Sequence, residues 1–597
     1  MDRKAIIVLL VSFLLLILWY PLVNRLYPPK PLPPRTNTLA SITNVPGSLT
    51  NQPSLSAATS FPGGVPVIST PIAPNQPEQF LVLSNDLARY TFTSHGGGIK
   101  FVELLRYLQR VECRNKMGTN APATLNRESS VPMLGLLPNE ALQGDGVFKI
   151  TRIDKGVRAE KALTNGLVFI KEFEPTSNYV VNVTTWIENR SQTALAVPPQ
   201  EWNVGSAAPM TEDDSLQNLG ILWYDGSGKH AEGESWFNNY TLGCPYFGSN
   251  PRTLYVAGQS NVVWAEVHNQ FFTTALMPEE KGHQVTARKF DLPPPSREVL
   301  AANPRANPKP YGFQSSVLYA ATNLASNQAL EKKFRIYAGP KENRTLERVA
   351  NQLKNDIDIV MGYTGPFGFF SKVLLWAMNG LNRLGLSYAL SIIAITVIIK
   401  LVFWPLTQAS TRSMKRMASL QPQMTAIRER YKDDPVKMNR KMMEFMKEHK
   451  VSPLGGCLPM LLQIPVFIGF FTMVRSAIEL RGARFLWACD LSKPDTLFFI
   501  PVLNFPFNPL PLIMGATMLW QARLTPASPG MDPAQQKIMK YMPLIFLFIL
   551  YNYSAGLTLY WTVQNLLTIA QTKLTRAKDE AIKTPPAGPQ KRKNNRP

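Results

Sequence analysis

Runs of apolar residues long enough to cross a lipid bilayer constrain this chain of 597 residues more than any other feature. A helical span needs roughly 20 apolar residues, at about 1.5 Å of rise per residue. The segment AIIVLLVSFLLLILWYPLV, residues 5–23, meets this requirement without one charge, and Arg3 and Lys4 precede it. No small-residue cleavage site follows closely, so we expect residues 1–23 to form an uncleaved signal anchor.

Five further apolar segments lie in the C-terminal part of the chain. They contain no Asp or Glu, and the chain shows no evident internal repeat, which argues against an ion-coupled transporter or channel. Prolines between 501 and 511 leave the start of the fourth span uncertain. We therefore predict a polytopic α-helical membrane protein with six transmembrane helices, at residues 1–23, 386–407, 455–476, 506–522, 538–553 and 556–572.

The distribution of positive charge along the chain indicates its membrane topology. A formal net charge of +22 would suggest nucleic acid as the partner of a soluble protein. With the N-terminus in the cytoplasm, however, six spans place residues 408–454 and the tail 573–597 in the cytoplasm as well. Residues 408–454 carry 11 Lys and Arg against 5 Asp and Glu, as the positive-inside rule requires. We expect no direct recognition of nucleic acid.

A large exported region separates the first span from the others. Residues 24–75 are rich in Pro, Ser, Thr and Asn, which predicts a disordered linker. Residues 76–345 hold short alternating segments such as NYVVNVTTWIE between Gly, Pro and Asn turns, which predicts a periplasmic all-β sandwich domain.

Helical spacing returns in residues 346–385. In FFSKVLLWAMNGLNRLG, Leu374, Met378 and Leu381 share one helical face. Two interpretations are open: a helix in the outer membrane–water interface, or a helix packed on the β domain.

The sequence offers no metal or nucleotide motif. Its five histidines and four cysteines lack metal-ligand spacing, and no GxxxxGK[ST] loop occurs. Cys113 and Cys244 both fall in the exported part, and their redox state is left open. An envelope enzyme or a sugar-binding sensor in the β domain is an alternative, but no catalytic constellation supports it. We expect no enzyme activity, no cofactor and no metal.

The cytoplasmic segment 408–454 is typical of a helical hairpin. The arms SMKRMASLQPQMTAIRERYK and PVKMNRKMMEFMKEHK flank Asp434, which can cap the second helix, and Pro435, which suits its first position. Met438, Met442 and Met446 form an i, i+4, i+8 stripe. The stripe either packs the hairpin or offers a soft apolar surface to partner segments.

Lys400 lies within AITVIIKLVFWPLT, where a membrane-centred cation costs about 2.5 to 3.5 kcal/mol. It either faces a wet groove or extends its stem to the headgroups. Several polar residues share the spans with it, and they either line that groove or form hydrogen bonds between helices. These residues are Thr396 one turn before Lys400, Gln463, and the series Gln564, Thr568 and Gln571.

Two segments resemble a known family. The stretch LQPQMTAIRERYKDDPVKMNRKMMEFMKEHKVSPLGGCLPMLLQIPVF resembles the signature region of the YidC/Oxa1/Alb3 membrane protein insertases, and YSAGLTLYWTVQNLLTIAQ resembles their last span. This resemblance covers roughly residues 367–578. The β domain, with SHGGGIKFVELL and RIYAGPKE, resembles more loosely the periplasmic domain of the Gram-negative YidC form.

The resemblance implies a five-helix insertase core in the bacterial inner membrane, with both termini cytoplasmic. Its hydrophilic groove would open to cytoplasm and lipid, with Lys400 where these proteins usually carry arginine. Lysine keeps the charge but lacks the bidentate fork, so a general electrostatic role is expected. The implied function is insertion and folding of nascent membrane proteins, alone or with the Sec translocon. Other implied partners are membrane lipid and, through the basic tail, the ribosome; a purely topogenic tail is the alternative.

Overall fold

The computed structural model describes residues 76–111, 121–137, 140–239, 250–365, 367–449, 458–500, 505–524 and 533–583. The predicted anchor (1–23), the linker (24–75) and the end of the tail (584–597) lie outside the described residues. Residues 69–531 and 539–597 belong to one compact unit, within which all the contacts given below lie.

The β domain extends from Phe80 to Pro340. It also contains the short helices α2 (Glu140–Gln143), α3 (Glu234–Phe237) and α4 (Arg297–Ala302). Its strands are β1 Phe80–Ser84, β2 Ala88–Thr93, β3 Gly98–Leu108, β4 Pro122–Leu125, β5 Lys149–Ile153, β6 Gly156–Ala162, β7 Leu167–Pro175, β8 Val180–Asn189, β9 Leu195–Val197, β10 Gln200–Ala207, β11 Gly220–Tyr224, β12 Lys229–Gly233, β13 Leu254–Ala257, β14 Trp264–His268, β15 Phe272–Pro278, β16 Gln284–Asp291, β17 Tyr311–Tyr319, β18 Thr322–Leu324 and β19 Ala329–Pro340.

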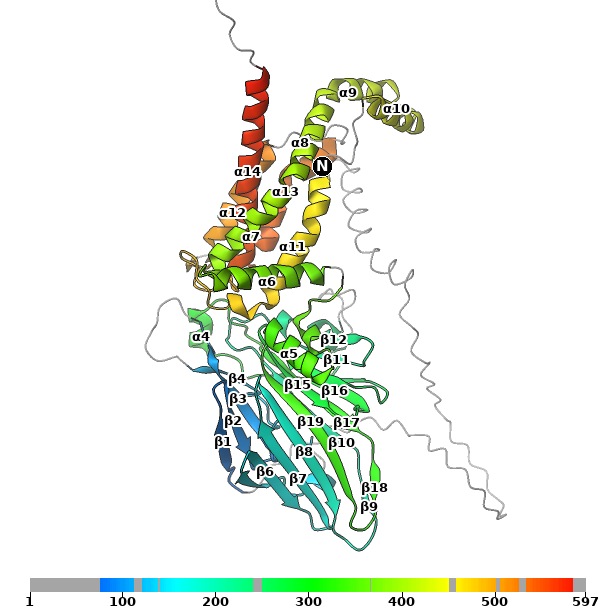
Figure 1. Ribbon diagram of the computed structural model, residues 1–597, viewed down its shortest axis with the longest axis vertical. Helices are drawn as coiled ribbons and strands as arrows, with labels where there is room; N and C mark the ends of the chain where they lie inside the picture. The colour runs from blue at the N-terminus through cyan, green and yellow to red at the C-terminus, as the bar shows by residue number, and fades with distance from the viewer. Residues whose placement is uncertain are drawn as a thin grey trace, which may run out of the picture. The chain divides into compact units, whose positions relative to one another are not determined.

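Two antiparallel sheets, one of nine and one of four strands, pack together in the core of this domain (Figure 1). The larger sheet has the order β12-β11-β14-β15-β19-β8-β7-β6-β5, and the other has β10-β17-β16-β13. Strand β10 packs against β14 and β15 of the larger sheet, with Trp202 fully buried and its ring centroid 5.4 Å from that of Phe334. The alternating burial along β8 is that of a strand with one face on a core. The predicted β sandwich is confirmed.

The helices follow the β domain. They are α5 Asn343–Leu353, α6 Gly368–Arg383, α7 Tyr388–Val402, α8 Trp404–Ser419, α9 Gln421–Arg430, α10 Pro435–Glu448, α11 Leu458–Ser476, α12 Pro509–Leu524, α13 Pro533–Leu550 and α14 Ala555–Lys583. A hairpin of β20 (Phe498–Ile500) and β21 (Phe505–Phe507) lies before α12, and β1-β2-β3-β4 and β18-β9 form two further small sheets. Helix α12 starts at Pro509, three residues after the predicted start of the fourth span.

Helix α6 packs on α11 rather than on the β domain alone. The Ser371 hydroxyl donates to the Gly469 carbonyl at 2.9 Å, and Leu374 and Met378 are buried on the same side. On the outside, Phe369 and Trp376 are 69% and 73% exposed. The helix is therefore amphipathic, with large apolar side chains left uncovered.

A sharp bend divides the predicted span 386–407. Helix α7, capped by the Ser387 side chain, ends at Val402, and α8 starts at Trp404 at an angle of 56°. Pro405 accounts for the break because it lacks an N–H and its ring clashes with the preceding turn. In the part of the chain described, no helix alone combines the length and apolarity of a membrane span, whereas this bent pair does so jointly.

The hairpin differs from the prediction in its first arm. Residues 413–432 were predicted as one helix, but α8 ends at Ser419 and α9 starts at Gln421. Pro422 stands in the first turn of α9, where a residue without an N–H costs no hydrogen bond within the helix. In the second arm the prediction is confirmed: the Asp434 side chain accepts from the Lys437 N–H at 3.0 Å, and Pro435 is the first residue of α10.

The loop between α11 and α12 is fastened to the β domain by cations. Arg481 donates to the carbonyls of Leu108 and Gln109 at 2.6 and 2.9 Å. Lys493 forms ion pairs with Asp213 and Asp214 at 3.2 and 3.0 Å. Cys489 in the same loop is disulfide-bonded, whereas Cys113, Cys244 and Cys457 lie outside the described residues.

Lys171 on β7 is fully buried in the β domain. Its Nζ donates to the carbonyls of Gly96 and Leu134, both at 2.8 Å, and lies 4.7 and 5.4 Å from the ring centroids of Phe148 and Trp202. Burial lowers the pKa of Lys171 to about 7. The neutral amine is therefore favoured in the folded domain at alkaline pH.

We predict that the β domain becomes more stable as pH rises from 7 to 9. In the unfolded chain Lys171 keeps its proton up to about pH 10.4, so the unfolded state binds more protons in this window. The free energy of unfolding should rise by at most about 1.4 kcal/mol per pH unit. Pulse proteolysis of the intact chain in urea, at pH 7, 8 and 9, measures this slope.

Lys171→Met should abolish the slope, because the titrating group is gone. Lys333→Met, at a half-exposed lysine of β19 in the same domain, should retain it. A wild-type stability that is flat between pH 7 and 9 would show that Lys171 stays charged in the fold.

Candidate functional site

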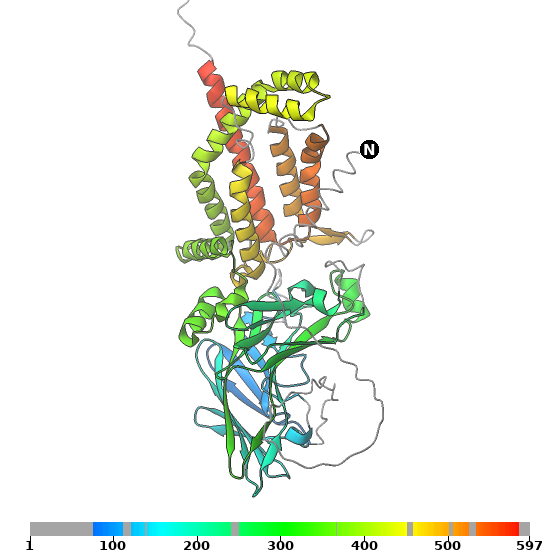
Figure 2. The ribbon, with the colours of Figure 1, turned by 90° about the vertical axis from the view of Figure 1, so that its right-hand side faces the viewer.

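Lys400 connects two helices of the bundle. It lies in the last turn of α7 and is only 7% exposed, and its Nζ donates to the Thr568 hydroxyl on α14 at 2.9 Å. Helices α7 and α14 lie side by side (Figure 2). The Thr568 hydroxyl in turn donates to the Gln564 carbonyl at 2.7 Å. A cation is thus held by a neutral oxygen whose own proton is already engaged.

A second polar contact lies one turn further along α14. The Gln571 side-chain amide donates to the Thr407 hydroxyl of α8 at 2.7 Å. Lys400 and Thr407 therefore lie on either side of the bend between α7 and α8, and each is bonded to α14. The predicted series on α14 brings Thr568 and Gln571 to this junction, with Gln564 buried on the preceding turn.

Two of the predicted residues have other partners. Thr396 is fully buried, and its hydroxyl donates to the Ile392 carbonyl of its own helix at 2.7 Å. Gln463 on α11 is within hydrogen-bonding reach of the Tyr560 hydroxyl on α14, while the Tyr560 ring stacks on Phe470 with centroids 4.2 Å apart. Neither contact involves Lys400.

Asn565 was missed by the sequence analysis. Its side chain donates to the Thr517 hydroxyl of α12 at 3.2 Å, and both residues are buried. Asn565 directly follows Gln564 and therefore lies on a different face of α14. A spacing of three or four residues from Gln564 does not include it. Polar side chains of α14 thus bond to α7, α8 and α12.

The methionine stripe lies largely inside the hairpin. Met446 is buried with Met417 and Met424, and Met442 packs against this cluster. Met438 is half-buried. On the outside of α10, Met443 and Val436 are 57% and 80% exposed, and the sequence analysis did not single them out.

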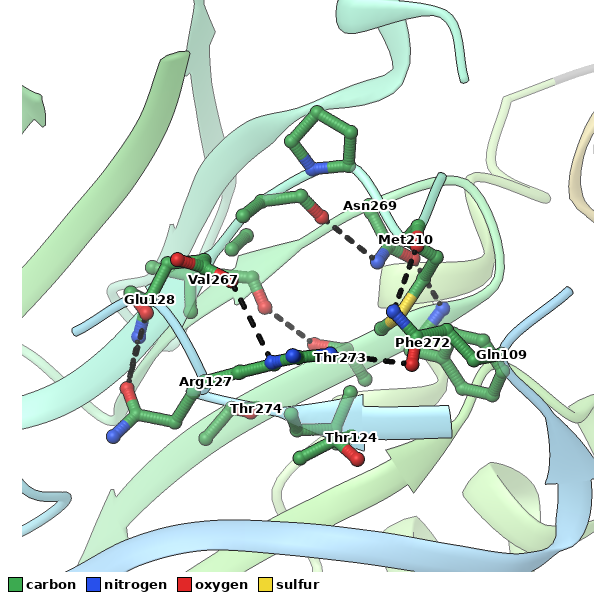
Figure 3. Close-up of a pocket in the computed structure, with 16 residues that line it drawn as sticks. Gln109, Thr124, Arg127, Glu128, Met210, Val267, Asn269, Phe272, Thr273 and Thr274 are labelled. Atoms are coloured by element: carbon green, nitrogen blue, oxygen red, sulfur yellow. Dashed lines mark hydrogen bonds and ion pairs between the residues drawn. The ribbon is translucent and has the colours of Figure 1, made fainter. Parts of the chain in front are cut away.

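A small cavity of about 40 Å³ lies in the β domain (Figure 3). Its polar side chains bond to one another and to the backbone: Arg127 donates to the Gln109 side-chain oxygen at 3.4 Å, and Gln109 donates to the Met210 carbonyl at 3.2 Å. The space suits a few water molecules. Among the described residues, no cluster of three or more His, Cys, Asp or Glu could hold a metal ion.

Family models cover both parts of the chain. The model described as "YidC periplasmic domain" matches residues 81–377, and the one described as "60Kd inner membrane protein" matches residues 380–581.

Individual relatives agree with these matches. The chain is 31% identical to the membrane protein insertase YidC of Cupriavidus metallidurans over 90% of each chain. It is 40% identical to that of Syntrophobacter fumaroxidans over 52% of this chain and 53% of the relative, so that alignment spans about half the relative's length. A solved structure titled as an active YidC insertase is 18% identical and covers 84% of this chain and 94% of its own, at a TM-score of 0.32, too low to bear on function.

We predict that Thr568→Val destabilises the helical bundle. The substitution keeps the side-chain shape but removes the acceptor of a buried cation, which should cost about 1.5 to 3 kcal/mol. Urea unfolding of the detergent-solubilised chain measures the loss. Lys400→Met should reduce the effect of Thr568→Val, since no cation then lacks a partner.

Thr572→Val is the matched control on the same helix. Its hydroxyl donates only to the Thr568 carbonyl, at 2.8 Å, among the contacts described. Equal losses from Thr568→Val and Thr572→Val would argue that Lys400 gains nothing from Thr568.

Proposed function

The chain belongs to the YidC family of membrane protein insertases, and we propose that it inserts nascent membrane proteins into the bacterial inner membrane and helps them fold. The observation that carries this proposal, beside the family, is Lys400: a buried cation held by the neutral Thr568 hydroxyl. Its curated relatives are named as insertases and not as enzymes. No nucleotide or other cofactor enters the proposed reaction.

The proposed role of Lys400 is to attract the polar or acidic segment of a nascent chain into a groove. A carboxylate adds the Coulomb attraction of an opposite charge to the hydrogen bond, which the neutral Thr568 hydroxyl does not supply. Such a carboxylate can therefore replace Thr568 as the partner of Lys400 at a net gain. The Lys400 ammonium is a point charge and lacks the planar, bidentate geometry of a guanidinium. It can therefore bind carboxylates that approach in differing orientations.

The apolar segment of the client would slide along the outside of the same helix. Ile398, Leu401 and Val402 of α7 are exposed next to the buried Lys400. One helix thus offers a polar contact inward and an apolar surface outward. Transfer of the client's hydrophobic span into lipid supplies the free energy.

The proposed topology has six spans with both termini in the cytoplasm. The first is residues 1–23, and the others are built from α7 with the start of α8, α11, α12, α13 and α14. In this arrangement α6 lies in the outer interface, which its exposed Phe369 and Trp376 support. The groove would include Lys400, Thr396, Gln463, Gln564, Thr568 and Gln571.

Further partners follow from the family and the charge. We propose that the chain acts alone or with Sec translocon components, and that the basic tail 573–597 contacts the ribosome. We also propose that the hairpin meets the client first. Its Met438, Met442 and Met446 would supply an adaptable packing, and the exposed Met443 and Val436 a contact surface.

We predict that Lys400→Ala lowers insertion of a small membrane protein with an acidic translocated tail roughly tenfold, equivalent to about 1.4 kcal/mol. Lys400→Arg should be active because the charge remains. The assay depletes the protein from its host, restores it with each variant, and scores protease protection of the tail.

The same client with its acidic residues replaced by Asn and Gln is the control, and its insertion should depend little on Lys400. Insertion that is unaffected by depletion would refute the insertase function. Full activity of Lys400→Ala on the acidic client would refute only the role of the charge.

We predict that Met443→Ser weakens crosslinking between the hairpin and a ribosome-bound nascent chain while leaving amide exchange of α10 unchanged, because Met443 is exposed. Met446→Ala should instead speed amide exchange along α10, because Met446 fills the hairpin core. Undiminished crosslinking by Met443→Ser would exclude this surface as the client contact.

A further inference from the structure

A pocket of about 530 Å³ lies against the last turns of α11 and the first turn of α14. It is bounded by the end of α11, the start of α14, the loop that follows α11, and the acidic stretch of the β domain around residues 213–218. Its volume falls within the range of small-molecule sites. Nothing in the proposed insertion step uses it.

The charges that line the pocket do not balance. Its cations are Arg305, Arg475 and Lys493. Lys493 forms ion pairs with both Asp213 and Asp214, so these three side chains together carry one negative charge, and with the two arginines the lining carries one net positive charge. The two arginines, by contrast, donate to neutral amide oxygens.

Arg305 donates to the Asn508 side chain at 3.4 Å, and Arg475 donates to the Asn218 side chain at 3.1 Å. Each guanidinium has five N–H donors, so most remain for a ligand. Burial lowers the pKa of Arg305, but a guanidinium remains charged at neutral pH. Arg305 is half-buried and Arg475 is exposed, and among the described contacts neither guanidinium has a carboxylate within hydrogen-bond distance, which favours an anion.

Apolar side chains form the wall on the bundle side. Phe471 and Val474 come from α11, Leu557 comes from the start of α14, and Tyr553 lies just before α14. Val474 and Leu557 are buried, so the accessible part of this wall is Phe471 and Tyr553, which a wholly polar anion would leave in contact with water. An anion attached to a hydrocarbon chain covers both surfaces.

We propose that this pocket binds an anionic phospholipid of the outer leaflet, with the phosphodiester between Arg305 and Arg475 and an acyl chain along Phe471 and Tyr553. The proposal rests on the proposed function in one respect: α11 and α14 must span the membrane, so that their outer ends lie at headgroup level. The bound lipid would stabilise the contact between the β domain and the helices, since the two arginines come from different sides of it.

The test uses the full chain, purified in detergent and loaded with a 1:1 mixture of phosphatidylglycerol and phosphatidylethanolamine. Native mass spectrometry counts the lipids retained. Wild type should retain phosphatidylglycerol at least fivefold more than phosphatidylethanolamine, and Arg305→Gln with Arg475→Gln should abolish this preference. Arg484→Gln is the matched control, because Arg484 is exposed on the same loop and is not among the pocket residues.

Circular dichroism and the thermal unfolding midpoint show whether the double variant is folded, and the charge-conserving Arg305→Lys with Arg475→Lys should keep part of the preference. Equal retention of phosphatidylglycerol by wild type and the Gln variant overturns the proposal. So does displacement of the lipid by an equal concentration of glycerol phosphate or of an acidic peptide, which would assign the pocket to a soluble anion or a peptide. Lipid retention is measured without any client, so a failure of the insertase function leaves this result unaffected.

Discussion

The hydrogen bond between Lys400 and Thr568 is the constraint on which the helical bundle depends. A cation on an otherwise apolar helix must find a partner, and the nearest helix offers a hydroxyl rather than a carboxylate. A carboxylate at this position would hold the lysine in a strong ion pair and leave it unavailable. The neutral acceptor keeps the cation in place while leaving most of its electrostatic potential uncompensated.

At the end of the bundle that contacts the β domain, the cations have different partners. There, Arg481 binds backbone carbonyls of the β domain and Lys493 binds two of its carboxylates, so both cations hold a long loop in place. Their role is structural. Arg305 and Arg475 are the exceptions, because their hydrogen bonds among the described residues go to amide oxygens and not to carboxylates. In both regions the cations of interest for function are those whose partners are neutral.

Much of this arrangement could be predicted from the sequence, because it depends on local patterns. The β sandwich followed from alternation, and the start of α10 followed from Asp434 and Pro435. The polar series on α14 predicted Thr568 and Gln571 at the junction with Lys400. The pairing of Thr396 with its own backbone, and of Gln463 with Tyr560, depends on rotamers and neighbours that spacing does not specify. The break at Leu420 was missed because a proline in a first helical turn permits either a start or a kink.

The bend at Phe403 would allow α8 to tilt as a rigid helix relative to α7. Its 16 residues make a rigid rod of about 24 Å, fixed near its short end by the bond between Thr407 and Gln571 and carrying the hairpin at its long end. A tilt of about 10° around the bend would move the far end by roughly 4 Å, given that length. Conversely, a force on the hairpin is transmitted along α8 to the bend, next to which Lys400 of α7 meets Thr568.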